Sequence, residues 1–171
     1  MENSQKIIEF TSFTVVKEEN TAIAMGSGDM PVFATPSMCA LMENAAMNAA
    51  KEYMDGSGLS GTTVGTLLNV THIKASPVGN EIKAVAQLSA VDKRRLIFKV
   101  SAYDTTANAL IGEGDHERFI GDREKVLGKL KKSSRAVLKI KEIPLFVEVS
   151  LYLLSGCLLE WSLLNYYLGD L

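Results

Sequence analysis

Residues 35–58 read TPSMCALMENAAMNAAKEYMDGSG and decide the expected fold. Apolar residues recur along this stretch at helical spacing, and Thr35 and Pro36 are typical of a helix start. In this reading Thr35 is the N-cap and Pro36 takes the first helical position. The glycines within residues 55–58 favour the left-handed conformation that ends helices. We therefore expect one long helix between these two signals.

This helix is apolar almost all round, which is typical of a core helix that a sheet must wrap. Glu43 is the only charged residue between Met30 and Lys51. Burial would raise the pKa of its carboxyl group unless hydrogen bonds stabilise the charged form. Such a carboxylate has either a functional role or a buried arginine partner, and the residues alone leave both open.

After the helix the apolar period changes from about 3.6 to 2, which indicates strands. Residues 7–25 predict one or two further strands before the helix. We expect four antiparallel strands in a meander after the helix, and the fold class is α+β, with a domain of about 120 residues. The four predicted strands span residues 64–72, 82–90, 96–102 and 110–120, with turns at 76–80, 92–94 and 105–108.

Composition limits the function classes. The net charge of −2 gives no general attraction to nucleic acid phosphates, so we expect no nucleic-acid partner. Two cysteines, Cys39 and Cys157, lie far apart, and the sequence has only two histidines. We therefore expect neither a disulfide framework nor a metal site, and no cofactor. The polar N-terminus has no signal-peptide pattern, so the expected location is a reducing cytoplasm.

Several short motifs, in order, resemble those of one known family. They are residues 32–35 (VFAT), 41–43 (LME), 65–66 (GT), 70–72 (VTH), 94–96 (RRL), 100–102 (VSA) and 116–118 (HER). Together they resemble the fluoroacetyl-CoA thioesterase-like family of hot-dog folds, in which a sheet curls round a central helix. The resemblance covers roughly residues 7–130. It implies a homodimer that hydrolyses acyl-CoA thioesters.

The resemblance also implies a site near the subunit interface. Its catalytic residues become Thr35, Glu43 and His72 in this sequence. The backbone N–H that polarises the thioester carbonyl falls on Gly65, and Arg118 matches the arginine of the HER motif, with no role assigned. Glu43 in an apolar helix could attack the carbonyl or activate a water, and His72 could protonate the leaving thiolate.

Each of these residues also has a purely structural reading. Glu43 could pair with a distant arginine, and His72 could be a satisfied core histidine. Thr35 could serve only as the N-cap, and Gly65 could mark a bulge. His116 lies in a charged run and is expected to be solvated or at an interface. A non-catalytic acyl-CoA-binding hot-dog module is the alternative function.

The loop at residues 22–31 bears on the acyl group. Characterised fluoroacetyl enzymes of the family carry phenylalanines before the helix, whereas this loop has no aromatic residue. Residues 26–29 are Gly, Ser, Gly and Asp, which are small and polar. We therefore expect a wet, mobile loop and several short acyl-CoA substrates with modest selectivity.

Two regions follow from this reading: a hot-dog domain at residues 1–130 and a C-terminal extension of unknown role at 131–171. Residues 125–141 are basic and predict a solvated helix. Residues 143–171 are apolar, but Glu160 would cost about 2.5 kcal/mol or more in a membrane-spanning helix. Packing on the domain or its dimer partner is therefore preferred to a membrane anchor.

Overall fold

The computed structural model describes residues 7–125 and 127–131. The chain divides into two compact units, Met1–Val126 and Leu127–Leu171. The fold and the site below lie within the first unit. The predicted tail at residues 143–171 lies outside the described residues. Within the described part of the chain, no helix is both long enough and apolar enough to cross a membrane.

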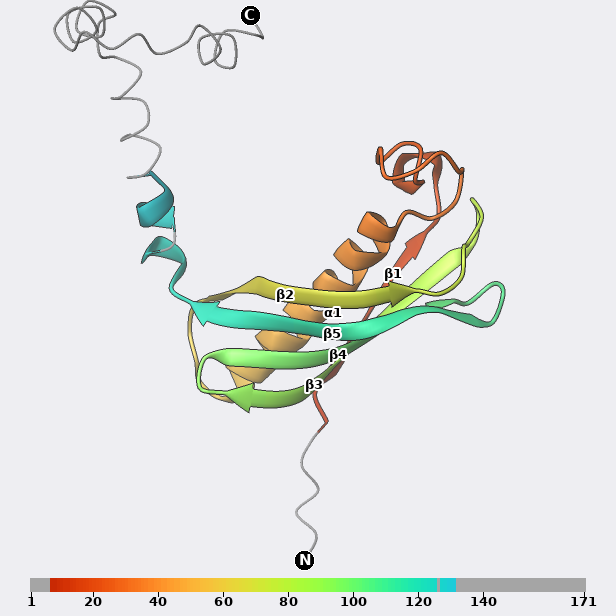
Figure 1. Ribbon diagram of the computed structural model, residues 1–171. Helices are drawn as coiled ribbons and strands as arrows, with labels where there is room; N and C mark the ends of the chain where they lie inside the picture. The colour runs from red at the N-terminus through yellow and green to blue at the C-terminus, as the bar shows by residue number, and fades with distance from the viewer. Residues whose placement is uncertain (1–6, 126, 132–171) are drawn as a thin grey trace, which may run out of the picture. The chain divides into compact units, whose positions relative to one another are not determined.

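One long helix packs against a five-stranded antiparallel sheet, which confirms the α+β class (Figure 1). The helix is α1 (Thr35–Gly56), and a short 3-10 helix, η1 (Glu18–Asn20), precedes it. The strands are β1 (Glu9–Val15), β2 (Thr62–His72), β3 (Glu81–Asp92), β4 (Arg95–Asp104) and β5 (Ala109–Gly121).

The sheet order is β1-β3-β4-β5-β2, so the predicted four-stranded meander is only partly correct. Strands β3, β4 and β5 do form a meander. Strand β2, however, pairs with β5 rather than with β3, and Leu68 lies opposite His116. The residues between β2 and β3 therefore connect strands that are not neighbours, which leaves β2 as an edge strand. Residues 7–25 form one strand, β1, which pairs with β3.

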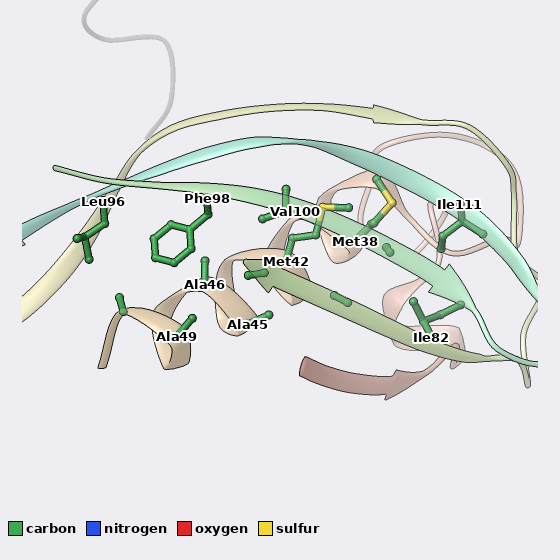
Figure 2. Close-up of a cluster of buried hydrophobic side chains, with 14 of the residues drawn as sticks. Met38, Met42, Ala45, Ala46, Ala49, Ile82, Leu96, Phe98, Val100 and Ile111 are labelled. Atoms are coloured by element: carbon green, nitrogen blue, oxygen red, sulfur yellow. The ribbon is translucent and has the colours of Figure 1, made fainter. Parts of the chain in front are cut away.

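The core lies between α1 and the sheet (Figure 2). Alanines line the buried face of the helix, and their small side chains let the sheet approach closely. The facing strands contribute larger apolar side chains, among them Phe98, which is fully buried. The labelled core residues are Met38, Met42, Ala45, Ala46, Ala49, Ile82, Leu96, Phe98, Val100 and Ile111.

Within the described residues the sheet covers only one face of α1, so the predicted enclosure of the helix is incomplete. Ala40, Asn44 and Met47 are exposed on the other face, and Met47 keeps 43% of its surface. The helix therefore carries apolar side chains that the described residues do not bury.

Candidate active site

Glu43 and Gly65 meet where α1 crosses the edge strand β2. A Cβ at position 65 would lie 2.7 Å from Oε1 of Glu43, so only glycine leaves room for the carboxylate. The register of β2 against β5 also shifts between Gly65 and Leu67, which marks a bulge. The expected bulge at Gly65 is therefore present, and the missing side chain leaves room for the Glu43 carboxylate.

The Glu43 side chain is not enclosed as the sequence predicted. Its side chain is 44% exposed in the single chain. Among the described residues, no hydrogen-bond donor contacts this carboxylate, and Nε2 of His116 lies 3.9 Å from Oε1. A half-exposed carboxylate without a donor is available to a substrate or to a water molecule.

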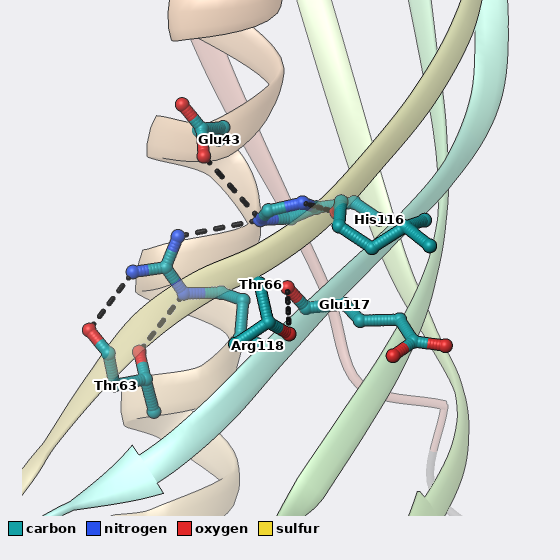
Figure 3. Close-up of polar contacts among 7 residues, drawn as sticks. Glu43, Thr63, Thr66, His116, Glu117 and Arg118 are labelled. Atoms are coloured by element: carbon teal, nitrogen blue, oxygen red, sulfur yellow. Dashed lines mark hydrogen bonds and ion pairs between the residues drawn. The ribbon is translucent and has the colours of Figure 1, made fainter.

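His116 is fully buried, so the prediction of a solvated or interface residue is wrong. Its Nδ1–H donates to the carbonyl oxygen of Leu67 at 2.7 Å (Figure 3). Burial lowers the pKa of His116 below 6.5, and the positive charge of Arg118 lowers it further, against opposing effects of the Leu67 carbonyl and nearby carboxylates. His116 is therefore neutral at pH 7, with its proton on Nδ1, and does not neutralise Glu43.

Arg118 completes this cluster from the same face of β5. Its Nη1–H donates to Nε2 of His116 at 3.3 Å. Its Nε and Nη2 donate to Oγ1 and the carbonyl oxygen of Thr63, at 2.9 and 3.0 Å. Burial lowers the pKa of Arg118, while the Glu43 carboxylate raises it. Arg118 is thus a charged, anchored group in the electrostatic field of Glu43 (Figure 3).

Thr35 and His72 form a separate pair at the start of α1. The helix N-cap is Ala34, and Thr35 is the first helical residue, so the predicted capping role of Thr35 is wrong. Its hydroxyl is free of that role and hydrogen-bonds Nδ1 of His72 at 2.8 Å. This contact ties the start of α1 to the end of β2.

The other ring nitrogen of His72, Nε2, is buried and makes no hydrogen bond with the residues that the structure describes. Burial lowers the pKa of His72 below 6.5, although the backbone of Lys74 partly opposes this shift. His72 is therefore neutral at pH 7 and presents an unused donor or acceptor.

The sequence-predicted residues thus form two groups rather than one. Eight residues of helix separate Thr35 from Glu43, which is about 12 Å along the axis. The chain brings Glu43 to Gly65, His116 and Arg118, and it brings Thr35 to His72. It does not place Glu43 beside His72.

Cys39 lies on the helix between these two groups. It is four residues from both Thr35 and Glu43, so the three side chains share one face of α1. Burial raises the pKa of its thiol, and the Glu43 carboxylate raises it further. The thiol therefore stays protonated at neutral pH, so Cys39 is not suited to act as a nucleophile.

Within residues 7–125 and 127–131, no cluster of His, Cys, Asp or Glu could hold a metal ion. The chemistry available here is that of a carboxylate, an imidazole, a hydroxyl and a guanidinium. A carboxylate beside a glycine backbone, with a hydroxyl-bound imidazole, is suited to attack on an activated carbonyl.

Comparison with solved structures identifies the fold of the chain. The structure is similar to a hot-dog-like protein from Thermanaerovibrio acidaminovorans, with a TM-score of 0.62 at 14% identity over 73% of this chain and 89% of that one. It is also similar to a thioesterase superfamily member from Thermus thermophilus, with a TM-score of 0.69 at 23% identity over 81% and 99% of the two chains. The fold is therefore the hot-dog fold.

The family follows from closer matches. Residues 16–124 match the family described as fluoroacetyl-CoA-specific thioesterase (FlK). A fluoroacetyl-CoA thioesterase from Streptantibioticus cattleyicolor is 39% identical over 106 residues, which are 61% of this chain and 72% of the relative. A variant of the fluoroacetyl-CoA thioesterase FlK, solved in complex with acetyl-CoA, has a TM-score of 0.65 at 32% identity over 73% of this chain and 95% of that one.

The chain belongs to the fluoroacetyl-CoA-specific thioesterase family, which confirms the resemblance drawn from the sequence motifs. It is a thioester hydrolase with acyl-CoA thioesterase activity.

Proposed function

We propose that this enzyme hydrolyses short-chain acyl-CoA thioesters with Glu43, His72 and Thr35 as its catalytic residues. One observation carries the proposal. The Glu43 carboxylate lies against the Gly65 backbone and accepts no hydrogen bond from the described residues. A carboxylate without hydrogen-bond donors has its oxygens free to attack a carbonyl or to accept a proton from water.

Two routes fit this carboxylate. In one, Glu43 attacks the acyl carbon, the C–S bond breaks, and the resulting mixed anhydride is cleaved by water. In the other, Glu43 removes a proton from a water that attacks the same carbon directly. Both release the acyl group as a carboxylic acid and coenzyme A as the thiol, with a proton delivered to the leaving sulfur.

His72 is proposed to carry a proton to that sulfur. With its Nδ1–H donated to Oγ1 of Thr35, the neutral ring can take a proton at Nε2 from the attacking water and pass it to the leaving sulfur. Gly65 is proposed to supply the backbone N–H for the developing oxyanion. Arg118 is proposed to supply positive charge near the reacting carbonyl, because its guanidinium already interacts electrostatically with the Glu43 carboxylate.

We also propose that the working site is completed in a homodimer through β2. The outer edge of β2 is unpaired among the described residues, and Val64 and Leu67 are 40% and 46% exposed there. Two β2 strands can pair antiparallel about a two-fold axis between Leu68 and Asn69. This register places Gly65 opposite His72 of the partner subunit. Glu43 of one subunit would then approach the Thr35 and His72 pair of its partner.

The loop at residues 22–31 supports a broad acyl specificity, with one correction to the sequence reading. Gly26–Asp29 are exposed, as expected of a polar loop, but Ile23, Met25 and Met30 are also exposed, at 56%, 47% and 58%. Backbone hydrogen bonds, such as Ser27 N–H to Ala22 O at 2.9 Å, close the loop on itself. The loop thus offers flexible apolar side chains rather than rigid aromatic walls.

Thiol release from a panel of acyl-CoAs tests the function. We expect kcat/KM to change by no more than about a hundredfold between acetyl-CoA and propionyl-CoA, and again between propionyl-CoA and butyryl-CoA, since one methylene contributes about 1–3 kcal/mol. A preference for fluoroacetyl-CoA over acetyl-CoA above about 10³-fold, or about 4 kcal/mol, would contradict the proposed breadth. No thiol release from any of them would contradict the activity. A cytoplasmic location is also proposed, consistent with the free thiol of Cys39.

A further inference from the structure

Asp104 is a buried carboxylate that belongs to neither group of the site. It is the last residue of β4, and 1% of its surface is exposed. Its Oδ2 accepts a hydrogen bond from Nδ2 of Asn80 at 2.7 Å, and its Oδ1 accepts the backbone N–H of Ala107 at 2.8 Å. Within residues 7–125 and 127–131, no basic side chain forms an ion pair with it.

The Asp104 side chain is nevertheless charged. Burial raises the pKa of its carboxyl group, but the hydrogen bonds from Asn80 and from the Ala107 backbone contribute to a net pKa below 3.8. The carboxylate is therefore ionised at neutral pH, and hydrogen-bond donors stabilise its charge. A buried charge of this kind is costly unless its hydrogen bonds are kept, so the segments that supply the donors are fixed to it.

The two bonds join two connections at one end of the sheet. Ala107 lies in the β4–β5 turn, and Asn80 ends the connection between β2 and β3, residues 73–80 (Figure 1). The turn has a bond of its own to β3, because Oγ1 of Thr106 accepts the Glu81 N–H at 3.0 Å. The bond from Asn80 is thus the one that fixes the connection.

We propose that Asp104 is a positioning residue for thioester hydrolysis, because through Asn80 it fixes the 73–80 connection on which the contact between Thr35 and His72 depends. The inference rests on the proposed function, since it concerns the pair that is proposed to carry the proton to the leaving sulfur. Asp104 acts only through the two segments that bear this pair.

The first of these segments is the start of α1. The backbone N–H of Phe33 donates to the carbonyl oxygen of Ser76 at 2.9 Å. Val32 forms an isolated antiparallel bridge with Pro77. Phe33 is also fully buried and lies two residues before Thr35. The connection therefore fixes the chain that leads directly into Thr35.

The second segment is the end of β2. His72 is the last residue of this strand, and the next residue, Ile73, donates its N–H to the carbonyl oxygen of Ile111 at 2.7 Å. At the far end of the connection, the carbonyl oxygen of Asn80 accepts the Val16 N–H at 2.8 Å. The connection forms no helix or named strand, so these bonds to neighbouring segments set its path.

The contact between Thr35 and His72 is sensitive to the position of both segments. Its two atoms are 2.8 Å apart. A hydrogen bond is lost beyond about 3.5 Å, so a shift of less than about 1 Å breaks this one. Misplacement by about 1 Å can lower a rate by about 10²-fold. Loss of one bond among several that hold the connection loosens it in part and is expected to lower the rate less.

The test compares Asn80→Ala with Thr106→Ala. Each removes one side-chain hydrogen bond from the same end of the sheet, but only the Asn80 bond reaches the connection. Asn80→Ala should lower kcat for acetyl-CoA about tenfold and change KM less than about twofold, because His72 acts in the chemical step. Thr106→Ala should change both by less than about twofold. Equal losses of kcat in the two variants, or a parental kcat in Asn80→Ala, would overturn the proposal.

Substitutions of Asp104 itself test the hydrogen-bonded route. In Asp104→Asn, one oxygen can still accept the Ala107 N–H, and the Asn80 amide can turn over to accept from the new amide. This variant should retain most of kcat, whereas Asp104→Ala should lose at least as much as Asn80→Ala. Equal losses in the two Asp104 variants would contradict a role through Asn80. If Asp104→Ala does not fold, the comparison of Asn80→Ala with Thr106→Ala decides.

Combination with Thr35→Val shows whether the effect passes through the Thr35–His72 bond. Adding Asn80→Ala to Thr35→Val should lower kcat by less than about twofold more, because the bond is already absent. A further loss of about tenfold would overturn the proposal, since the two substitutions would then act independently.

NMR of the His72 ring gives a readout that does not depend on activity. The proton on Nδ1 should exchange with water about tenfold faster in Asn80→Ala than in the parent, and at the parental rate in Thr106→Ala. Equal exchange in Asn80→Ala and the parent would overturn the positioning role. If exchange is faster as expected but Thr35→Val keeps the parental kcat, the proposed catalytic role of the pair fails while its positioning by Asp104 stands.

Discussion

Oγ1 of Thr35 and Nδ1 of His72 lie 2.8 Å apart, although 37 residues separate them in sequence. The bond connects the first residue of α1 with the last residue of β2 and fixes one ring nitrogen of His72. A histidine that must deliver a proton from its other nitrogen depends on such an anchor for its tautomer and orientation.

Thr35→Val should therefore lower kcat while the fold is retained. Valine has the shape of threonine without its hydroxyl, and Thr35 is exposed and makes no capping bond. Loss of one positioned proton-transfer partner is expected to lower kcat by about 10²-fold. Thr35→Ser keeps the hydroxyl and should retain most of the rate. Equal kcat values for the valine variant and the parent would contradict the role of this bond.

Glu43→Gln should abolish nearly all turnover, with a loss of at least about 10³-fold in kcat. The amide keeps the size of the side chain but can neither attack a carbonyl nor accept a proton from water. Glu113→Gln on β5 is the matched control and should have parental activity. Hydrolysis within tenfold of the parent in Glu43→Gln would contradict the catalytic role. In ¹⁸O-water, label entering the Glu43 carboxylate during turnover would identify the anhydride route.

Gly65→Ala should impair activity far more than stability. The added Cβ would lie 2.7 Å from Oε1 of Glu43, a flexible end that can move away, and 3.2 Å from Cε1 of His116, which needs only a small shift. The displaced carboxylate should lower kcat/KM by at least about 10²-fold. Gly56→Ala is the control, since nothing lies within 4 Å of its Cβ position. It should retain full activity and gain up to about 1 kcal/mol of stability. A large drop in Tm for Gly65→Ala would indicate a structural role instead.

The α+β class follows from sequence because both of its signals are local. The helical period of residues 35–56 and the two-residue period of the strands each appear within one element. The pairing of β2 with β5 joins residues such as Leu68 and His116, and alternation within a strand carries no information about which strand is its neighbour. Local patterns therefore predict that strands consecutive in sequence pair with each other, and this prediction is wrong for β2.

The role of His116 was missed for a different reason. Its neighbours Asp115 and Glu117 are charged, and both pair on the outer face of the sheet, Asp115 with Lys99 and Glu117 with Arg95. Residues of a strand alternate between faces, so His116 and Arg118 point inward, on the same face as Ile120. The two-residue period of β5 is the feature of the sequence that indicates an inward-facing His116. The pairing of Thr35 with His72 had no such signal, because it depends on how the helix start meets the end of β2.

Stability should fall as the pH is lowered below 6.5. The pKa of buried His116 is lowered from 6.5, and that of His72 is also lowered, so the unfolded chain binds more protons between pH 6.5 and the folded pKa values. Protonation then favours unfolding across that window, and stability is regained as the pH rises through it. Urea denaturation at pH 7.5 and 5.5 measures this change. His116→Asn, which can still donate to the Leu67 carbonyl, should show a smaller loss between the two pH values. An identical loss in the variant would show that His116 is not the group responsible.

Mixing two inactive variants tests whether the site is shared between subunits. Glu43→Ala and His72→Ala should each be inactive alone, because each lacks one catalytic group. If Glu43 of one subunit works with His72 of the partner subunit, a mixed dimer of the two variants contains one intact site and one that lacks both groups. Unfolding and refolding an equimolar mixture should then restore about a quarter of parental activity, since half the dimers are mixed and half their sites are intact. A site built within one subunit would give no recovery, because every site in the mixture would lack either Glu43 or His72. Size-exclusion chromatography before and after mixing confirms that the recovered activity belongs to dimers. Absence of recovery in verified mixed dimers would overturn the proposed pairing through β2.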